Sequence, residues 1–67
     1  MIKILLNGKN KTIEDKTNLN LLLKKLSIES NKVAIEINGV VVSKNDYEKK
    51  IIKTNDKIEI VHFIGGG

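Results

Sequence analysis

The ten residues VAIEINGVVV, residues 33–42, decide the fold of this chain. Val33, Ile35 and Ile37 recur at every second position, which places them on one face of a strand. Asn38-Gly39 follows directly, and both residues tolerate the positive φ that a two-residue hairpin turn requires. The stretch therefore predicts two antiparallel strands that turn one apolar face toward a core.

The N-terminal residues repeat this pattern. Residues 2–6 alternate in the same way, and Asn7-Gly8 supplies a second hairpin signal. Residues 11–14 are expected to form the returning strand, with Ile13 toward the core. A second hairpin is therefore predicted at the start of the chain.

Between the two hairpins, the spacing of the leucines predicts an amphipathic helix. Asn18 is well placed to cap its N-terminus. Lys24 and Lys25 fall in its last turn, where cations interact favourably with the helix dipole, and Leu21 lies off the apolar stripe. Four leucines at i, i+3, i+4 and i+7 form that stripe: Leu19, Leu22, Leu23 and Leu26.

A polar segment follows the second hairpin. Residues 43–50 are expected to hold a single helical turn that starts at Ser43 or Asn45. Ile51 and Ile52 are expected to anchor this segment to the core.

Residues 57–63 predict a final strand, with Ile58 and Ile60 inward. Together these elements predict an α+β domain over residues 1–64, in which a mixed sheet of four to five strands packs on one helix. With a single helix, the second face of the sheet stays open.

The open face is expected to carry Leu5 from the first strand and Val61 and Phe63 from the last. If these two strands are neighbours, the three side chains form an exposed apolar patch, which would mark a protein contact. Three scattered surface hydrophobes are the alternative.

Composition bounds the function. The chain has 67 residues, no cysteine and a net charge of +4, so it makes one small domain without disulfides. Every basic residue is lysine and only two residues are aromatic, which favours a mixed solvated surface over a nucleic-acid site. We expect a cytoplasmic protein, because neither a signal peptide nor a membrane-spanning run is visible, and we expect it to be a monomer.

Catalytic residue combinations are missing from the sequence. His62 is the single histidine and has no cysteine with which to share a metal. The glycines form no phosphate-binding loop, since Gly8 and Gly39 belong to hairpin signals. We therefore expect no metal site, and a protein that is not an enzyme by itself.

The last three residues are Gly65, Gly66 and Gly67. Without Cβ atoms they can pass through a channel that larger residues would block. The sequence predicts a flexible tail over residues 65–67, joined to the domain through Ile64, whose terminal carboxylate is the reactive group. A frayed terminus or a remnant of expression is the alternative.

Residues 33–42, residues 56–61 and the terminal glycines resemble the ThiS family, the sulfur carriers of thiamine biosynthesis. The resemblance covers essentially the whole chain and implies the ubiquitin-like β-grasp fold. It also implies that Gly67 is the natural C-terminus. The chain departs from the family pattern at three places: Ser43-Lys44 replaces Pro-Arg, Tyr47 replaces Trp, and Asn55-Asp56 replaces Gly-Asp.

The resemblance implies a mechanism and partners. A ThiF-like enzyme would use ATP and magnesium to adenylate the Gly67 carboxylate, and a sulfur donor such as a cysteine desulfurase would convert it to a thiocarboxylate. A ThiG-like thiazole synthase would then accept the sulfur. Gly66 and Gly67 would thread the partners' active sites, while Ile64 and Gly65 would span the distance from the domain to the entrance. The partner surface would consist of Leu5, Val61, Phe63 and Ile64, and the chain itself would bind no cofactor.

Three other functions stay open. The MoaD family, which supplies sulfur to molybdopterin, shares the fold and a diglycine end, although its members are typically longer and have prolines before the tail. A ubiquitin-like modifier joined to lysines would use the same terminus. An interaction domain with an incidental tail is the last possibility.

Overall fold

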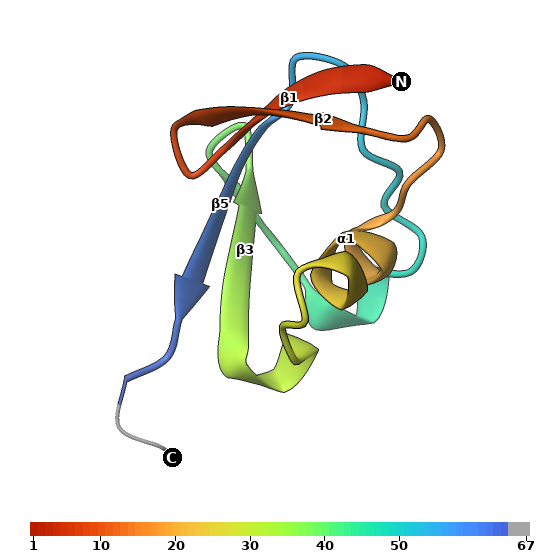
Figure 1. The fold of residues 1–67 in the computed structure, drawn as a ribbon. Helices are drawn as coiled ribbons and strands as arrows, with labels where there is room; N and C mark the ends of the chain where they lie inside the picture. Colours follow the sequence, from red (N-terminus) through yellow and green to blue (C-terminus); the bar gives the residue numbers. More distant parts are fainter. Residues whose placement is uncertain (65–67) are drawn as a thin grey trace.

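The computed structural model describes residues 1–64. Its strands form one five-stranded mixed sheet in the order β2-β1-β5-β3-β4, and a single α-helix packs on one face (Figure 1). This is the α+β architecture that the sequence predicts. The elements are β1 (Ile2–Leu6), β2 (Lys9–Ile13), α1 (Leu19–Lys25), the 3-10 turn η1 (Ser30–Lys32), β3 (Val33–Ile37), β4 (Val40–Val42), the 3-10 turn η2 (Lys44–Asp46) and β5 (Lys57–His62).

The last strand, β5, lies in the middle of the sheet. It runs parallel to β1, with Leu5 opposite Lys57, and antiparallel to β3, with Ile37 opposite Ile58. The first and last strands are therefore neighbours, as the predicted apolar patch of Leu5, Val61 and Phe63 requires. A central strand bonds on both sides, so β5 is held along most of its length before the chain leaves the domain.

Both predicted hairpins are present and use the predicted turns. Asn7 and Gly8 have φ of 49° and 80°, and Asn38 and Gly39 have φ of 53° and 84°. Positive φ at both central positions suits the right-handed twist of the flanking strands. Strand β2 begins directly after Gly8, two residues earlier than expected, because Leu6 pairs with Lys9.

Helix α1 begins where the sequence predicts. The main-chain N–H of Leu21 donates to Asn18 Oδ1 at 2.8 Å, which caps the N-terminus. The amide Nδ2 of Asn18 also donates to the carbonyl of Glu48 at 3.0 Å, so the cap ties the helix to a distant segment. Leu21 is 49% exposed, as its position off the apolar stripe predicts. With only seven residues the helix depends on packing for its stability.

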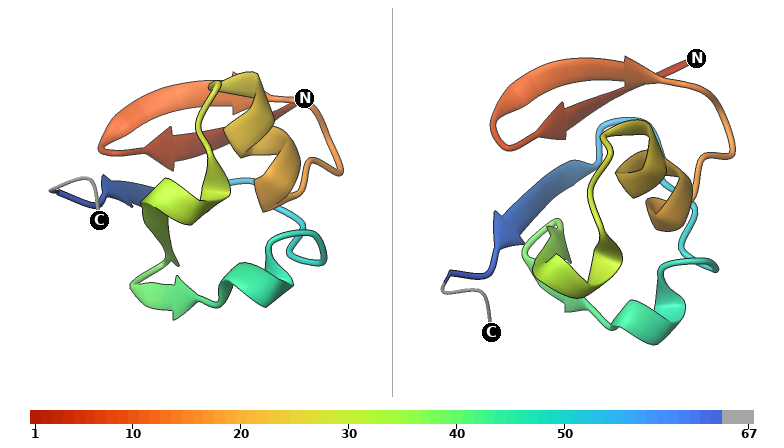
Figure 2. Two further views of the ribbon diagram at one scale, coloured as in Figure 1. Left: turned by 90° about the horizontal axis from the view of Figure 1, so that it is seen from below. Right: turned by 60° about the horizontal axis from the view of Figure 1, so that its bottom comes forward.

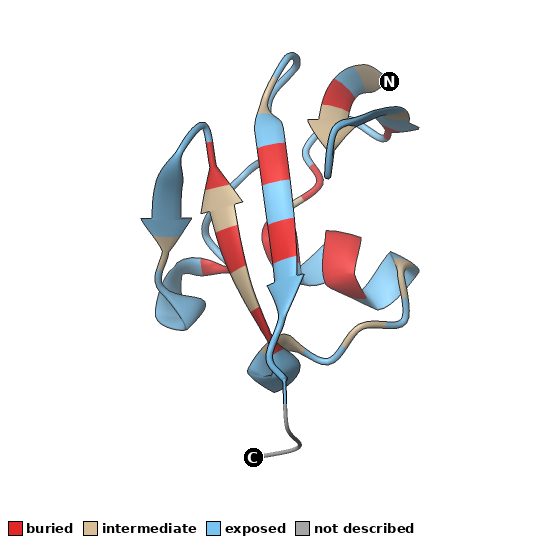
Figure 3. Cartoon of the chain, turned by 90° about the vertical axis from the view of Figure 1, so that its left-hand side faces the viewer, coloured by how far each residue is buried: buried red, intermediate tan, exposed pale blue. Residues whose placement is uncertain are grey.

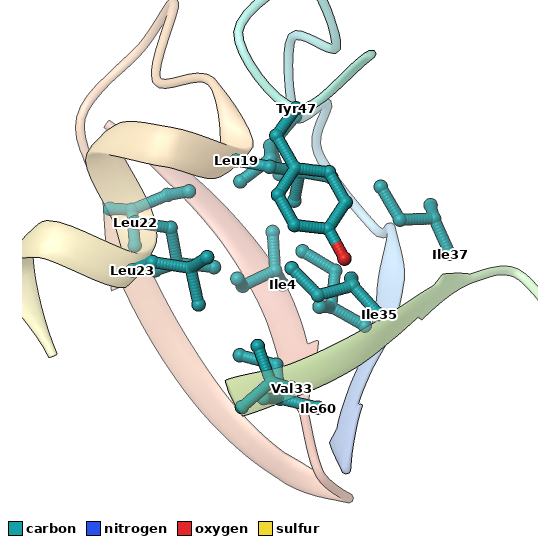
Figure 4. Close-up of a cluster of buried hydrophobic side chains, with 12 residues drawn as sticks. Ile4, Leu19, Leu22, Leu23, Val33, Ile35, Ile37, Tyr47 and Ile60 are labelled. Atoms are coloured by element: carbon teal, nitrogen blue, oxygen red, sulfur yellow. The ribbon is translucent and has the colours of Figure 1, made fainter. Parts of the chain in front are cut away.

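The core lies between α1 and the sheet (Figures 2 and 4). Tyr47 is buried among the isoleucines of β3, although it comes from the segment 43–50 that the sequence analysis described as polar. The hydrophobic residues with the least exposure are Ile4, Ile13, Leu19, Leu22, Leu23, Val33, Ile35, Ile37, Tyr47, Ile52, Ile58 and Ile60.

The segment after β4 differs from the expectation at one residue. The expected helical turn is η2, which follows Ser43, although the Ser43 side chain makes no capping hydrogen bond. Ile52 is buried, but Ile51 is 41% exposed, so the prediction that both isoleucines anchor the segment is wrong for Ile51. The reason is that Ile51 pairs with Asn18 in an isolated bridge, and adjacent residues in extended backbone point to opposite sides.

Among residues 1–64, α1 covers only one face of the sheet, and Figure 3 views the other face. Along β5 the burial alternates, so that Ile58 and Ile60 face α1 while Lys57, Glu59 and Val61 face outward. We call this outward side the open face. Within residues 1–64 no helix has the length and apolar character needed to cross a membrane.

Candidate functional site

The candidate site begins where the chain leaves the sheet. Strand β5 ends at His62, one residue earlier than expected, yet the N–H of Phe63 still donates to the carbonyl of Lys32 at 2.9 Å. Ile64 is 98% exposed. The fold therefore holds the chain as far as Phe63 and presents Ile64 to solvent. Gly65, Gly66 and Gly67, the predicted tail, lie outside the described residues.

The anchor for this exit is the short turn η1. Lys32 Nζ lies 2.9 Å from Glu29 Oε2, and this hydrogen bond and the charge of Glu29 raise the pKa of Lys32. Both side chains are largely exposed, so the ion pair adds little stability. The hydrogen bond between the main chains of Phe63 and Lys32 is thus the contact that directs the exit.

The residues predicted to contact partners are only partly brought together. Leu5 is half-buried on β1, while Val61 and Phe63 are 55% and 62% exposed. Because Leu5 lies opposite Lys57, it is four positions from Val61, or roughly 13 Å along the strand. Leu5 and Val61 line one shallow depression, but Lys57 and Glu59 line it with them.

Register adds residues to the open face that the sequence reasoning missed. Ala34 on β3 lies opposite Val61, and Glu36 lies opposite both Glu59 on β5 and Val41 on β4. Val41 is 67% exposed. The alternation within residues 33–37 shows that Glu36 points away from the core, but only the strand order shows that it faces Glu59.

Two asparagines hold β5 from opposite sides. The N–H of Ile60 donates to Asn7 Oδ1 at 2.7 Å, and Asn7 Nδ2 donates to the carbonyl of Ile60 at 3.3 Å. On the other side, the N–H of Lys57 donates to Asn38 Oδ1 at 2.9 Å, and Asn38 Nδ2 donates to Asp56 Oδ1 at 3.0 Å. The sequence reasoning assigned these asparagines only a turn conformation.

The described part of the chain offers little for catalysis. His62 is exposed at the end of β5. Among residues 1–64, no three histidine, cysteine or carboxylate side chains gather closely enough to hold a metal ion. Burial raises the pKa of Tyr47, an effect opposed by a hydrogen bond to the backbone of Ile35, but this tyrosine belongs to the core.

Within residues 1–64, one helix packs on a five-stranded mixed sheet whose central strand is the last one, which is the β-grasp architecture. Residues 4–67 match the model of the ThiS family. The chain belongs to this family, the sulfur carrier proteins of thiamine biosynthesis. The resemblance noted in the sequence is thereby confirmed.

Individual relatives agree with this assignment. The chain is 38% identical to the sulfur carrier protein ThiS of Bacillus subtilis over 63 residues, which cover 92% of this chain and 96% of that protein. The crystal structure of the thiamine biosynthesis protein ThiS from Geobacter metallireducens superposes with a TM-score of 0.85 at 29% identity. That match covers 98% of this chain and all of the other, so the fold is the β-grasp of ThiS.

A longer protein also contains a similar segment. The chain is 46% identical over 66 residues to a thiazole synthase of Magnetococcus marinus. The match covers 98% of this chain but only 20% of the length of that protein.

Proposed function

We propose that this chain carries sulfur for thiazole formation in thiamine biosynthesis, as a thiocarboxylate on Gly67. The observation that carries the proposal is the family match over residues 4–67, which includes all three terminal glycines. The chain is then a protein substrate for other enzymes, and the chemistry takes place in their active sites.

Sulfur transfer to Gly67 first requires activation of its carboxylate. A carboxylate is anionic and has a poor leaving group, so it does not react directly with a sulfur nucleophile. A ThiF-like enzyme holding ATP and magnesium would form the acyl-adenylate of Gly67 and release pyrophosphate. A persulfide from a cysteine desulfurase would then displace AMP, and a second thiol would release the thiocarboxylate by reducing the resulting acyl disulfide.

The fold supports this use of the C-terminus. Main-chain hydrogen bonds fix the chain as far as Phe63, which bonds to Lys32, and Ile64 is exposed to solvent. From there residues 64–67 span at most roughly 13 Å when extended. Gly66 and Gly67 lack Cβ atoms, so this length could enter a recessed active site while the sheet docks outside it.

The acceptor that we propose is a ThiG-like thiazole synthase. The segment similar to this chain within the Magnetococcus marinus thiazole synthase supports this choice, because it joins a carrier-like sequence to that enzyme in one polypeptide. We further propose that Val61, Phe63 and Ile64, with Leu5 farther along the open face, contact the partners. The exposure of the first three, from 55% to 98%, leaves them available.

Intact mass spectrometry tests the proposal. The full chain is incubated with a ThiF-like enzyme, Mg-ATP and a cysteine desulfurase with cysteine and a thiol reductant. We expect the replacement of one oxygen by sulfur at the C-terminus, dependent on ATP and lost on deletion of Gly67. Addition of a thiazole synthase and its other substrates should return the mass to that of the carboxylate.

Other outcomes identify the competing functions. Transfer of the sulfur only to a molybdopterin synthase would assign the chain to that pathway instead. Isopeptide adducts on other proteins would indicate a modifier. An unchanged mass in the complete mixture would contradict every carrier function.

A further inference from the structure

The sequence contains two Asn-Gly dipeptides, Asn7-Gly8 and Asn38-Gly39. Each dipeptide forms a hairpin turn, with φ of 49° and 80° in the first and 53° and 84° in the second. At both glycines, no atom lies within 4 Å of the place where a Cβ would be. The two turns therefore match in sequence, backbone conformation and open surroundings, and they differ in what holds the asparagine amide.

An asparagine that precedes glycine can lose its side-chain nitrogen spontaneously. The main-chain nitrogen of the glycine attacks Cγ of the asparagine and forms a new C–N bond. The bond from Cγ to Nδ2 breaks, and ammonia leaves with the proton of the glycine N–H. Water then opens the resulting succinimide ring to aspartate or isoaspartate. Glycine favours ring closure because it has no Cβ to hinder the approach of its nitrogen.

The amide of Asn7 is held by the middle of the central strand. Its Oδ1 accepts from the N–H of Ile60 at 2.7 Å and its Nδ2 donates to the carbonyl of Ile60 at 3.3 Å, and both hydrogen bonds are partly buried. Ring closure requires the amide to rotate away, which leaves the Ile60 N–H without its partner. A partly buried N–H without a partner is costly, so the fold should slow the reaction at Asn7.

The amide of Asn38 is held at the beginning of the same strand. Its Oδ1 accepts from the N–H of Lys57, the first residue of β5, at 2.9 Å, and its Nδ2 donates to Asp56 Oδ1 at 3.0 Å. Both hydrogen bonds are exposed, so water can replace the amide as the partner of the Lys57 N–H. The rotation that precedes ring closure therefore costs less at Asn38 than at Asn7.

We propose that Asn38 is a site of spontaneous deamidation in the folded protein, whereas the fold protects Asn7. This inference does not depend on the carrier function. The aspartate product places a second carboxylate where Asn38 Nδ2 donates to Asp56. A hydrogen bond between the second hairpin and the start of β5 is then replaced by repulsion between like charges. Deamidation at Asn38 is thus an irreversible modification that weakens the domain.

Peptide mapping tests the selectivity. Trypsin cleaves after lysine, so it releases residues 4–9 and residues 33–44 as separate peptides, each with a single asparagine. The full chain is aged in mildly alkaline buffer, and the gain of one mass unit is followed in each peptide. In the folded protein we expect residues 33–44 to react about fivefold faster than residues 4–9, the factor that corresponds to one net hydrogen bond.

The unfolded chain is the matched control. In guanidinium chloride the hydrogen bonds of both amides are lost, so the two peptides should react at nearly the same rate. Equal rates in the folded protein, or a faster reaction at Asn7, would overturn the inference. The same fivefold ratio in guanidinium chloride would also overturn it, because the difference would then come from the local sequence.

The effect on stability has its own test. Asn38→Asp reproduces the aspartate product, and its melting temperature should fall below that of the wild type. Addition of Asp56→Asn exchanges the two groups, so that an amide can again donate to a carboxylate, and the melting temperature should recover in part. An unchanged melting temperature in Asn38→Asp, or no recovery in the double variant, would contradict the repulsion between residues 38 and 56.

Discussion

The side-chain amide of Asn7 pairs with the main chain of Ile60 through two hydrogen bonds. Ile60 N–H donates to Oδ1 at 2.7 Å and Nδ2 donates to the Ile60 carbonyl at 3.3 Å, across 53 residues of sequence. The main-chain N–H of Asn7 donates to the Ile58 carbonyl at 2.8 Å, and the chain then enters the hairpin turn, with φ of 49° at Asn7. The amide thus continues the parallel pairing of β1 and β5 beyond Leu6, at the half of β5 nearest the tail.

The Asn7–Ile60 pairing should be measurable as stability. Asn7→Gly keeps a residue that accepts positive φ but removes both side-chain bonds. We expect the free energy of unfolding to fall by roughly 1–2 kcal/mol, measured by urea denaturation. Asn7→Asp keeps the acceptor and loses the donor, so its stability should lie between the two. A urea midpoint for Asn7→Gly equal to that of the wild type would contradict this role.

The packing of Ile58 against α1 gives a second prediction. Ile58 has no exposed surface and lies on the central strand. Ile58→Ala should lower the free energy of unfolding by about 2–4 kcal/mol, which can unfold a domain of this size. Ile58→Val, with an expected loss of about 1 kcal/mol, keeps the test possible if the alanine variant does not fold. Val61→Ala, on the open face, should have little effect.

The glycine tail can be tested without altering the domain. Gly66→Val should lower the rate of adenylation by about 100-fold, because a branched side chain would misplace the carboxylate in a narrow channel. The melting temperature should stay unchanged, since the buried core is formed by residues between Ile4 and Ile60. Wild-type adenylation of Gly66→Val would show that the tail enters no such channel.

The apolar part of the open face gives a prediction that is independent of charge. Val61→Ser with Phe63→Ser should raise the KM of the adenylating enzyme for this chain by about tenfold, with little change in kcat, if these side chains contact the partner. Val40→Ser is the matched control, because Val40 is 67% exposed on β4 beside the second hairpin turn. An equal effect from the control would point to a general loss of surface hydrophobicity.

Ionisation of Tyr47 should lower the stability of the domain at alkaline pH. Burial raises its pKa above the ordinary value of about 10, while a hydrogen bond to the Ile35 backbone acts in the opposite direction. Between the unfolded and folded pKa values the unfolded state holds fewer protons, so the stability that Tyr47 contributes is complete below pH 10 and is lost as the pH rises through the folded pKa. Tyr47 is the one tyrosine in a chain without tryptophan, so its ionisation can be followed directly by ultraviolet absorbance.

The control for this pH dependence is Tyr47→Phe. Because the lysines titrate in the same range, the comparison is the difference in melting temperature between wild type and variant from pH 8 to pH 11. That difference should shrink as the pH rises. A constant difference, with an absorbance midpoint at the pKa of free tyrosine, would contradict the burial of the hydroxyl.

Local patterns accounted for most of the elements. Asn-Gly pairs between alternating apolar runs predicted both hairpins, and the leucine spacing with Asn18 predicted the helix and its start. The pattern failed at Ile51, since two adjacent isoleucines in extended backbone cannot both face one core. Asn55 in place of glycine fits its turn with φ of 69°, as expected for a residue that tolerates the left-handed region.

The candidate site was less accessible to such reasoning. The outward positions of Leu5, Val61 and Phe63 follow from the alternation of residues along their strands. The separation of Leu5 from Val61 by Lys57 and Glu59, however, depends on the register of β1 with β5. The opposition of Glu36 and Glu59 depends likewise on the register of β3 with β5. Registers between strands distant in sequence are set by the packing of the whole core, and no window of sequence contains that information.

By itself, the sequence determined the turns, the helix, the inward face of each strand and the family resemblance, because these depend on the conformational preferences and spacing of neighbouring residues. Only the tertiary structure decided that β5 is the central strand, that Asn7 and Asn38 bond to it from both sides, and that two glutamates meet on the open face. The physical reason is that each of these features joins residues at least 18 positions apart, whose meeting depends on how the completed core aligns the strands.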